Sequence, residues 1–155
     1  MSISRQNLSI VIVTFKSEAV IHECIKSIDK DIKITVVENS NNFQFKDVLE
    51  KSYKNVSCVL SSENLGMGSG NNIGIKRATT DFVLILNPDV IRADDFFSNV
   101  SELITKIEDF SIIGCQYLYD NIFMPAGFFN KKKNSQFVKD FRKIKNKSLT
   151  KVEWV

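Results

Sequence analysis

The chain has 155 residues, of which 43% are hydrophobic and 25% are charged, with 6 Gly, 2 Pro and a formal net charge of +3. This is the length of one ordinary domain and the composition of a globular protein, which excludes collagen-like, low-complexity and wholly disordered classes. The longest apolar runs, such as residues 82–86, hold about five residues, whereas roughly 20 are needed to cross a bilayer, so we expect no transmembrane helix.

The charge is unevenly distributed along the chain. Nine basic residues and a single acidic one lie from Lys131 to Lys151, so a mildly acidic body is followed by a strongly basic segment. Cys24, Cys58 and Cys115 are odd in number and widely spaced, as expected for reduced thiols in a cytoplasmic protein. No small-residue cleavage site follows the N-terminal apolar run, so we expect this run to form a first strand rather than a signal peptide.

Strands and helices alternate in the first half of the chain. The apolar, β-branched run at residues 9–15 indicates a strand that is buried on both faces. Apolar residues at helical spacing follow Ser17, a plausible N-cap, and indicate a helix that ends near Asp29. The pattern then predicts a strand, a short helix and a strand, at residues 33–37, 45–49 and 55–60.

The second half continues the alternation. The pattern predicts a loop, a helix, a strand, a helix and two further strands, at residues 61–70, 71–79, 81–86, 93–108, 111–118 and 122–129. Repeated alternation of strand and helix predicts an open, mainly parallel α/β sheet with right-handed crossovers. We expect residues 1–129 to form this domain, and residues 130–155, where the hydrophobic pattern thins, to form a basic segment.

Polar clusters follow each of the first four predicted strands, at residues 14–16, 38–42, 64–72 and 87–89. In open parallel sheets, ligands bind beyond the carboxyl ends of the strands. This placement therefore favours a binding function over a purely structural one.

The cluster after the third predicted strand is rich in glycine. Gly66, Gly68 and Gly70 lie just ahead of a predicted helix, where backbone N–H groups can approach a phosphate or a sugar. A flexible linker is the alternative, although the interleaved asparagines and the amphipathic helix that follows do not favour it. The segment is not a dinucleotide-binding fingerprint, because Asn71 stands where the third glycine is needed.

The cluster after the fourth predicted strand contains one carboxylate. Asp89 follows Pro88 at the end of a buried strand, where it could hold Mg²⁺ or Mn²⁺ together with phosphate oxygens. An aspartate in an ordinary strand-to-helix turn is the alternative, and a single carboxylate taken alone favours that interpretation.

Taken in order, four segments resemble the family 2 glycosyltransferases of the GT-A fold, and most closely the bacterial rhamnosyltransferase-like group. They are Val-Thr-Phe-Lys at 13–16, Val-Val-Glu-Asn-Ser at 36–40, the Glu-Asn-x-Gly segment at 63–75 and Leu-Asn-Pro-Asp at 86–89. The last occupies the place of the family's Asp-x-Asp motif. The resemblance implies a Rossmann-like, mainly parallel α/β sheet flanked by helices and truncated at its C-terminal side.

The resemblance also implies roles for individual residues. Thr14 and Phe15 would line the pocket for the nucleobase, with the Phe15 ring stacked on the base, and Glu38 would accept a hydrogen bond from the base ring N–H. Asn64 and the loop from Gly66 to Asn72 would bound the nucleotide-sugar site. Asp89, with Asn87 beside it, would ligate the Mg²⁺ or Mn²⁺ ion that bridges the diphosphate. Glu38 and Asn87 depart from the usual family pattern, which has Asp at both positions in general and Asn at the second in this subgroup.

The implied function is inverting transfer of a sugar from a dTDP- or UDP-linked donor to a polysaccharide or lipid-linked acceptor. Members of the family continue beyond the point matched by Trp154 and Val155, and the general base for the acceptor lies in that later part, so no catalytic residue is identified here. A non-catalytic nucleotide-sugar-binding module, or a remnant of such an enzyme, is therefore the alternative. A subunit that completes its sheet with another chain or copy is a third.

The basic segment from Lys131 to Lys151 has three interpretations, of which the sequence disfavours the last. It is a solvated segment, or a surface that contacts anionic lipid on the inner face of the membrane, at ~1 kcal/mol per basic residue. Nucleic-acid binding is the third, and we expect no nucleic-acid partner, because Phe137 and Phe141 form no recognisable RNA-binding motif.

Overall fold

The computed structural model describes residues 3–106, 112–114, 117–119 and 122–124. Contacts divide the chain into two compact units, Met1–Ser101 and Glu102–Val155, and each is described by itself. The expected boundary between residues 129 and 130, and the basic segment beyond it, lie outside the described residues. No helix in the described part of the chain is long and apolar enough to cross a membrane.

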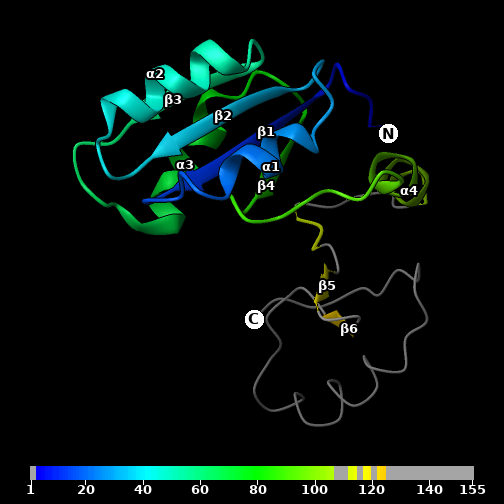
Figure 1. Ribbon diagram of the computed structural model, residues 1–155. Helices are drawn as coiled ribbons and strands as arrows, with labels where there is room; N and C mark the ends of the chain where they lie inside the picture. Colours follow the sequence, from blue (N-terminus) through cyan, green and yellow to red (C-terminus); the bar gives the residue numbers. More distant parts are fainter. Residues whose placement is uncertain (1–2, 107–111, 115–116, 120–121, 125–155) are drawn as a thin grey trace, which may run out of the picture. The chain divides into compact units, whose positions relative to one another are not determined.

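The first unit is built on a four-stranded parallel sheet with the strand order β3-β2-β1-β4 (Figure 1). The predicted mainly parallel α/β sheet is thus confirmed. The strands fall within one residue of the expected bounds: β1 (Leu8–Thr14), β2 (Lys33–Glu38), β3 (Val56–Leu60) and β4 (Phe82–Leu86).

The register brings the carboxyl ends of the strands to one edge of the sheet. Thr14 of β1 pairs with Glu38 of β2, which in turn pairs with Leu60 of β3. On the other side of β1, Ile12 pairs with Leu86, so the segment after β4 begins beside the end of β1. The polar clusters that the sequence places after these strands therefore meet along a single edge.

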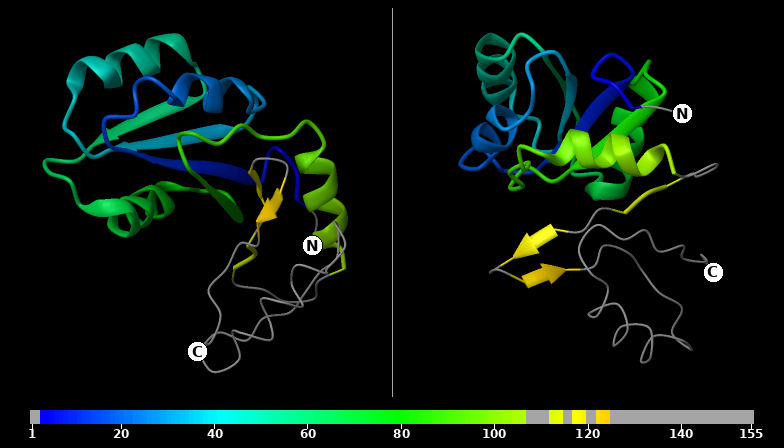
Figure 2. Two further views of the ribbon diagram at one scale, coloured as in Figure 1. Left: turned by 60° about the horizontal axis from the view of Figure 1, so that its bottom comes forward. Right: turned by 90° about the vertical axis from the view of Figure 1, so that its right-hand side faces the viewer.

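Helices cover both faces of the sheet (Figure 2, left). α1 (Ile21–Lys26) and α2 (Phe43–Ser52) pack on one face, where Ile10 and Ile12 of β1 lie in the hydrophobic core with Ile21 and Leu49. α3 (Gly66–Arg77) packs on the opposite face against β1 and β2. The α2 helix begins at Phe43 because the Asn42 side chain accepts the Phe45 N–H at 3.0 Å and caps it.

The first helix is shorter than the sequence indicates, and the expected N-cap is wrong. The backbone carbonyl of Ser17 accepts the N–H groups of Val20 and Ile21, so the chain makes a turn before α1 begins. The Ser17 hydroxyl instead bonds the backbone of Phe15, at 3.3 Å to its oxygen. Serine side chains readily bond nearby backbone groups both in turns and in helix caps. The presence of Ser17 in the sequence therefore does not distinguish a turn from a cap.

Two later elements also differ from expectation. α4 (Phe96–Ile104) starts after Ala93 rather than at it, because the Ala93 carbonyl accepts both the Phe96 N–H and the Arg92 side chain. In the second unit, β5 (Tyr117–Tyr119) and β6 (Ile122–Met124) form an antiparallel pair. Residues 112–114, expected to lie in a strand, are outside any strand, whereas 107–111, 115–116, 120–121 and 125–129 lie outside the described residues.

Candidate functional site

The end of β1 presents one buried hydroxyl and one exposed aromatic ring. The Thr14 side chain is 1% exposed, and its Oγ1 has no hydrogen-bond partner in the described part of the chain. The next residue, Phe15, is 47% exposed, with the Lys16 ammonium 5.5 Å from its ring centroid. An exposed ring at this edge can stack on a flat ligand ring, and a buried hydroxyl without a partner gains most from a ligand hydrogen bond.

The carboxylate of Glu38 lies at the end of β2, wholly buried. Its Oε1 accepts the Ser40 N–H at 2.9 Å and also the Ser40 hydroxyl, and its Oε2 accepts the Asn42 N–H at 2.7 Å. Glu38 therefore organises the turn between β2 and α2. Oε1 thus accepts two hydrogen bonds and Oε2 only one, so Oε2 can accept a further one, and the contact with a base N–H stays a prediction.

Asn39 is a residue that sequence reasoning did not single out. Its side chain is 2% exposed, its N–H donates to the Thr14 carbonyl at 2.8 Å, and its Nδ2 donates to the Gly66 carbonyl at 3.2 Å. The remaining amide oxygen, Oδ1, has no partner among the described residues. Asn39 thus joins the ends of β1 and β2 to the start of α3, and its place beside Glu38 in a polar cluster was the available signal.

The glycine-rich segment is helical, which corrects the expected loop from Gly66 to Asn72. Gly66, with φ of +74°, is the first residue of α3, and the Asn64 side chain accepts its N–H at 3.0 Å. A Cβ atom at Gly70 would lie 2.8 Å from a methyl group of Val13. Gly66 therefore allows the turn into α3, and Gly70 allows the helix to lie close to the sheet. From the spacing of the glycines alone, this arrangement cannot be distinguished from a phosphate-binding loop.

The same packing places Asn72 away from the sheet. Gly70 and Gly74 are the buried residues of α3, and Asn72, midway between them and roughly half a turn from each, is exposed. The structure thus brings Asn64 and Gly66 to the edge where Thr14 and Glu38 lie, whereas Asn72 lies on the outer face of α3. Its role at the nucleotide-sugar site stays a prediction.

A tight turn follows β4 and carries the expected metal ligand. The Asn87 carbonyl accepts the Val90 N–H at 3.2 Å, which places Pro88 and Asp89 at the centre of the turn. Proline suits this position because its ring fixes φ near −65°. Asn87 and Asp89 are both exposed, as ligands that share a cation with a phosphate need to be.

The donor set at this turn fits a hard divalent cation held jointly with a ligand. Asp89 supplies a carboxylate and Asn87 an amide oxygen, and Mg²⁺ is typically held by one or two carboxylates together with phosphate oxygens. In the described part of the chain, no group of three or more His, Cys, Asp or Glu residues could hold a metal ion by itself.

A buried thiol supports the turn from α1. The Sγ atom of Cys24 lies 3.5 Å from the Asn87 carbonyl oxygen and donates to it. Burial, and after it the negative charge of Asp89, raises the pKa of the Cys24 thiol to about 11. The thiol therefore stays protonated at neutral pH and remains a hydrogen-bond donor to Asn87.

Comparisons with known proteins show which proteins this chain is similar to. Over 88 residues the chain is 33% identical to the low-salt glycan biosynthesis hexosyltransferase Agl10 of Haloferax volcanii, covering 54% of this chain and 28% of that protein. The solved structures of TarS from S. aureus, as residues 1–349 and as a longer chain, superpose with TM-scores of 0.56 at 23% and 22% identity. Each match covers 64% of this chain, but only 32% of the shorter TarS chain and 20% of the longer one.

These structural neighbours confirm the GT-A-like fold expected from the sequence motifs. The sequence model of glycosyl transferase family 2 matches residues 9–152, nearly the whole chain and all four motifs. The chain therefore belongs to glycosyl transferase family 2.

Proposed function

We propose that this chain binds a nucleoside-diphosphate sugar at the carboxyl edge of its parallel sheet, as the donor for glycosyl transfer. The observation that carries the proposal is the meeting of three polar segments around the end of β1. Thr14, the last residue of β1, pairs with Glu38 of β2 on one side of β1. On the other side of β1 lies β4, which is followed by the Asn87–Asp89 turn. From β1 the chain continues to β2 and β3 on one side, and it then crosses to β4 on the other side. Doubly wound sheets bind nucleotides in the crevice at such a reversal of strand order.

The base and ribose would lie on the β1–β2 side of this crevice. Phe15 offers an exposed ring for stacking, and Thr14 offers a buried hydroxyl that has no hydrogen-bond partner among the described residues. Glu38 would accept the base N–H through a lone pair that the turn leaves unused. Asn64 and Gly66 at the start of α3 would bound the sugar-phosphate side, where the first N–H groups of the helix favour negative charge.

The diphosphate would lie near the turn after β4. Asp89 and Asn87 would hold a Mg²⁺ or Mn²⁺ ion there, and such an ion stabilises negative charge on a departing diphosphate. The carboxylate of Asp89, held in a rigid turn, would set the position of this ion. In an inverting displacement, the acceptor hydroxyl attacks the anomeric carbon and loses its proton to a base within hydrogen-bond reach.

Donor and acceptor are proposed at a finer level from the motifs. The Leu-Asn-Pro-Asp segment supports a dTDP- or UDP-linked sugar of the rhamnosyltransferase-like group, and the Agl10 name supports a hexose. A polysaccharide or lipid-linked acceptor fits both. We propose that the basic residues from Lys131 to Lys151 contact anionic lipid at the inner face of the membrane, where a cytoplasmic transferase would meet a lipid-linked acceptor.

Binding of the donor without transfer is the second candidate function. One observation favours it: the motifs and the residues that meet at the sheet edge all belong to the expected donor side. The two candidates differ in turnover, since a binding module holds the nucleotide sugar without breaking its glycosidic bond.

The test is release of nucleoside diphosphate from UDP-, dTDP- and GDP-sugars in the presence of Mn²⁺. Asp89→Asn is expected to lower the rate by about 100-fold or more, because it removes the carboxylate that holds the charge-stabilising ion. Asp81→Asn is the matched control, since Asp81 is an exposed aspartate just ahead of β4, at its opposite end. Equal rates for Asp89→Asn and the unchanged chain would contradict the role of Asp89 as the cation ligand. Binding of nucleotide sugar with no release from any donor would contradict the transferase and favour the binding module.

A further inference from the structure

Two hydrogen bonds, called the fastening points below, join the segment that carries Asp89 to α1 and its C-cap. Before Asp89 in the sequence, the Asn87 carbonyl accepts the thiol of Cys24 at 3.5 Å. After Asp89, the backbone N–H of Arg92 donates to the hydroxyl of Ser27 at 3.0 Å. Cys24 lies in the last turn of α1 and Ser27 is the C-cap of this helix, so both fastening points lie at the end of one short helix.

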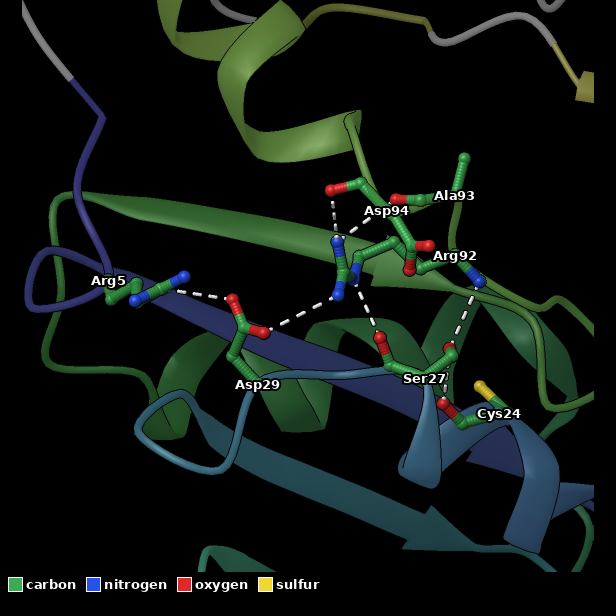
Figure 3. A network of polar contacts seen from close by, with 7 residues as sticks. All are labelled: Arg5, Cys24, Ser27, Asp29, Arg92, Ala93 and Asp94. Atoms are coloured by element: carbon green, nitrogen blue, oxygen red, sulfur yellow. Dashed lines mark hydrogen bonds and ion pairs between the residues drawn. The ribbon is translucent and has the colours of Figure 1, made fainter.

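Arg92 is the centre of a polar network around the second point (Figure 3). Its Nε donates to the Ser27 carbonyl at 2.7 Å, and one terminal nitrogen lies 3.4 Å from an Asp29 carboxylate oxygen. The other terminal nitrogen donates to the carbonyls of Ala93 and Asp94, at 2.9 and 3.3 Å. The Arg92 side chain is only 10% exposed, so these bonds are formed largely away from water.

The partners of Arg92 are themselves held in place. The Ser27 hydroxyl donates to the Cys24 carbonyl at 2.7 Å, which links the two fastening points to each other. The other carboxylate oxygen of Asp29 accepts Nε of Arg5 at 2.9 Å. The guanidinium of Arg92 also lies 5.0 Å from the ring centroid of Phe97 and is thereby fixed from a further side.

Asp89 itself is exposed, so the path of the backbone between the two fastening points sets where its carboxylate lies. We propose that Arg92 is a positioning residue that holds the Asn87–Asp89 turn in the geometry required to ligate the divalent cation. The inference rests on the proposed function, because it takes Asp89 as the cation ligand. Residues that orient metal ligands from behind commonly change metal affinity by 10- to 100-fold when they are replaced.

The test separates cation-dependent from cation-independent nucleotide binding. The Kd of UDP, dTDP and GDP is measured by calorimetry in EDTA and in Mn²⁺, and the ratio of the two values gives the Mn²⁺ enhancement for the nucleotide that binds best. Arg92→Gln is expected to lower this enhancement by about tenfold while leaving the Kd in EDTA within about twofold. Arg92→Lys keeps the charge near Asp29 but lacks the planar set of donors, so it should restore only part of the enhancement.

Arg5→Gln is the matched control, because it removes the other arginine of Asp29 without touching the segment after β4. It should keep the full enhancement. Ser27→Ala removes the hydroxyl that joins Arg92 to Cys24, and it should lower the enhancement in the same direction. The unchanged Kd in EDTA shows that each variant is folded and that its base site is intact.

Three results would overturn the inference. An Arg92→Gln chain with full Mn²⁺ enhancement would overturn it alone and leave the proposed function standing. Equal weakening in EDTA and in Mn²⁺ would show that Arg92 supports the fold in general rather than the cation site. An unchanged chain that binds nucleotide without any Mn²⁺ enhancement would overturn the cation role of Asp89 together with that of Arg92.

Discussion

The carboxylate of Glu38 is buried with no ion-pair partner among the described residues, and it is held by hydrogen bonds from the turn that follows β2. Glu38→Gln would place an NH₂ group against the N–H of either Ser40 or Asn42. Leaving one of these groups unsatisfied costs about 1–3 kcal/mol, so we expect a loss of that size in the free energy of unfolding. Chemical denaturation measures it.

Glu63→Gln is the control for this substitution, because Glu63 is exposed and the change in charge is the same. It should alter the free energy of unfolding by less than about 0.5 kcal/mol. If both variants were equally stable, the hydrogen bonds of Glu38 to the turn would make no net contribution and its burial would need another explanation.

At the residue scale, the sequence showed which residues have chemistry to offer but not which partners they take. The exposed position of Asn87 and Asp89 could be predicted, because a tight turn with a central proline after a strand exposes its polar side chains, whereas their role as cation ligands stays a prediction. The bonds of Glu38 to its own turn could not be predicted, since they depend on the backbone path after β2. Asn39 was missed for the same reason: its contact with Gly66 joins residues far apart in the sequence.

The close packing of α3 against β1 depends on glycines spaced one turn apart. A Cβ atom at Gly74 would lie 2.3 Å from a methyl group of Val11, whereas one at Gly68 would meet nothing within 4 Å. Gly74→Ala is therefore expected to destabilise the fold by about 1–3 kcal/mol through overpacking, although alanine is the better helix former. Gly68→Ala should stabilise it by about 0.5–1 kcal/mol.

The pair of variants is compared by chemical denaturation under the same conditions. Because both substitutions add one methyl group to the same helix, the helix propensity cancels and only the distance to β1 differs. Stabilisation by both alanines would show that α3 lies farther from the sheet than the contacts of Gly74 indicate.

At the element scale, the existence of helices and strands could be predicted better than their ends. The strands of the parallel sheet were found within one residue of their bounds because each is a largely apolar run followed by a polar cluster. The start of α3 was missed because glycine disfavours a helix interior in water, and only contact with β1 makes Gly70 and Gly74 favourable there. The start of α1 was missed because Ser17 forms a turn instead of a cap.

For the whole molecule, the alternation of strand and helix was enough to predict a parallel sheet, and the parallel sheet was enough to gather the polar clusters at one edge. The strand order β3-β2-β1-β4 adds what the sequence did not contain: β1 lies between the end of β2 and the turn after β4. Two strands were also predicted at residues 111–118 and 122–129, whereas the antiparallel pairing of β5 and β6 is seen only in the structure.

The most direct test of the donor site is thermal unfolding of the chain with UDP, dTDP and GDP, each with and without Mn²⁺. At about one hundred times Kd, a nucleotide that binds only the folded chain should stabilise it by ~2.7 kcal/mol, or roughly 5–10 °C in Tm. We expect such a rise with one nucleotide, dependent on Mn²⁺, and loss of the Mn²⁺ dependence in Asp89→Ala. A cooperatively unfolding sample whose Tm rises with none of the nucleotides would contradict a donor site at the carboxyl edge of this sheet.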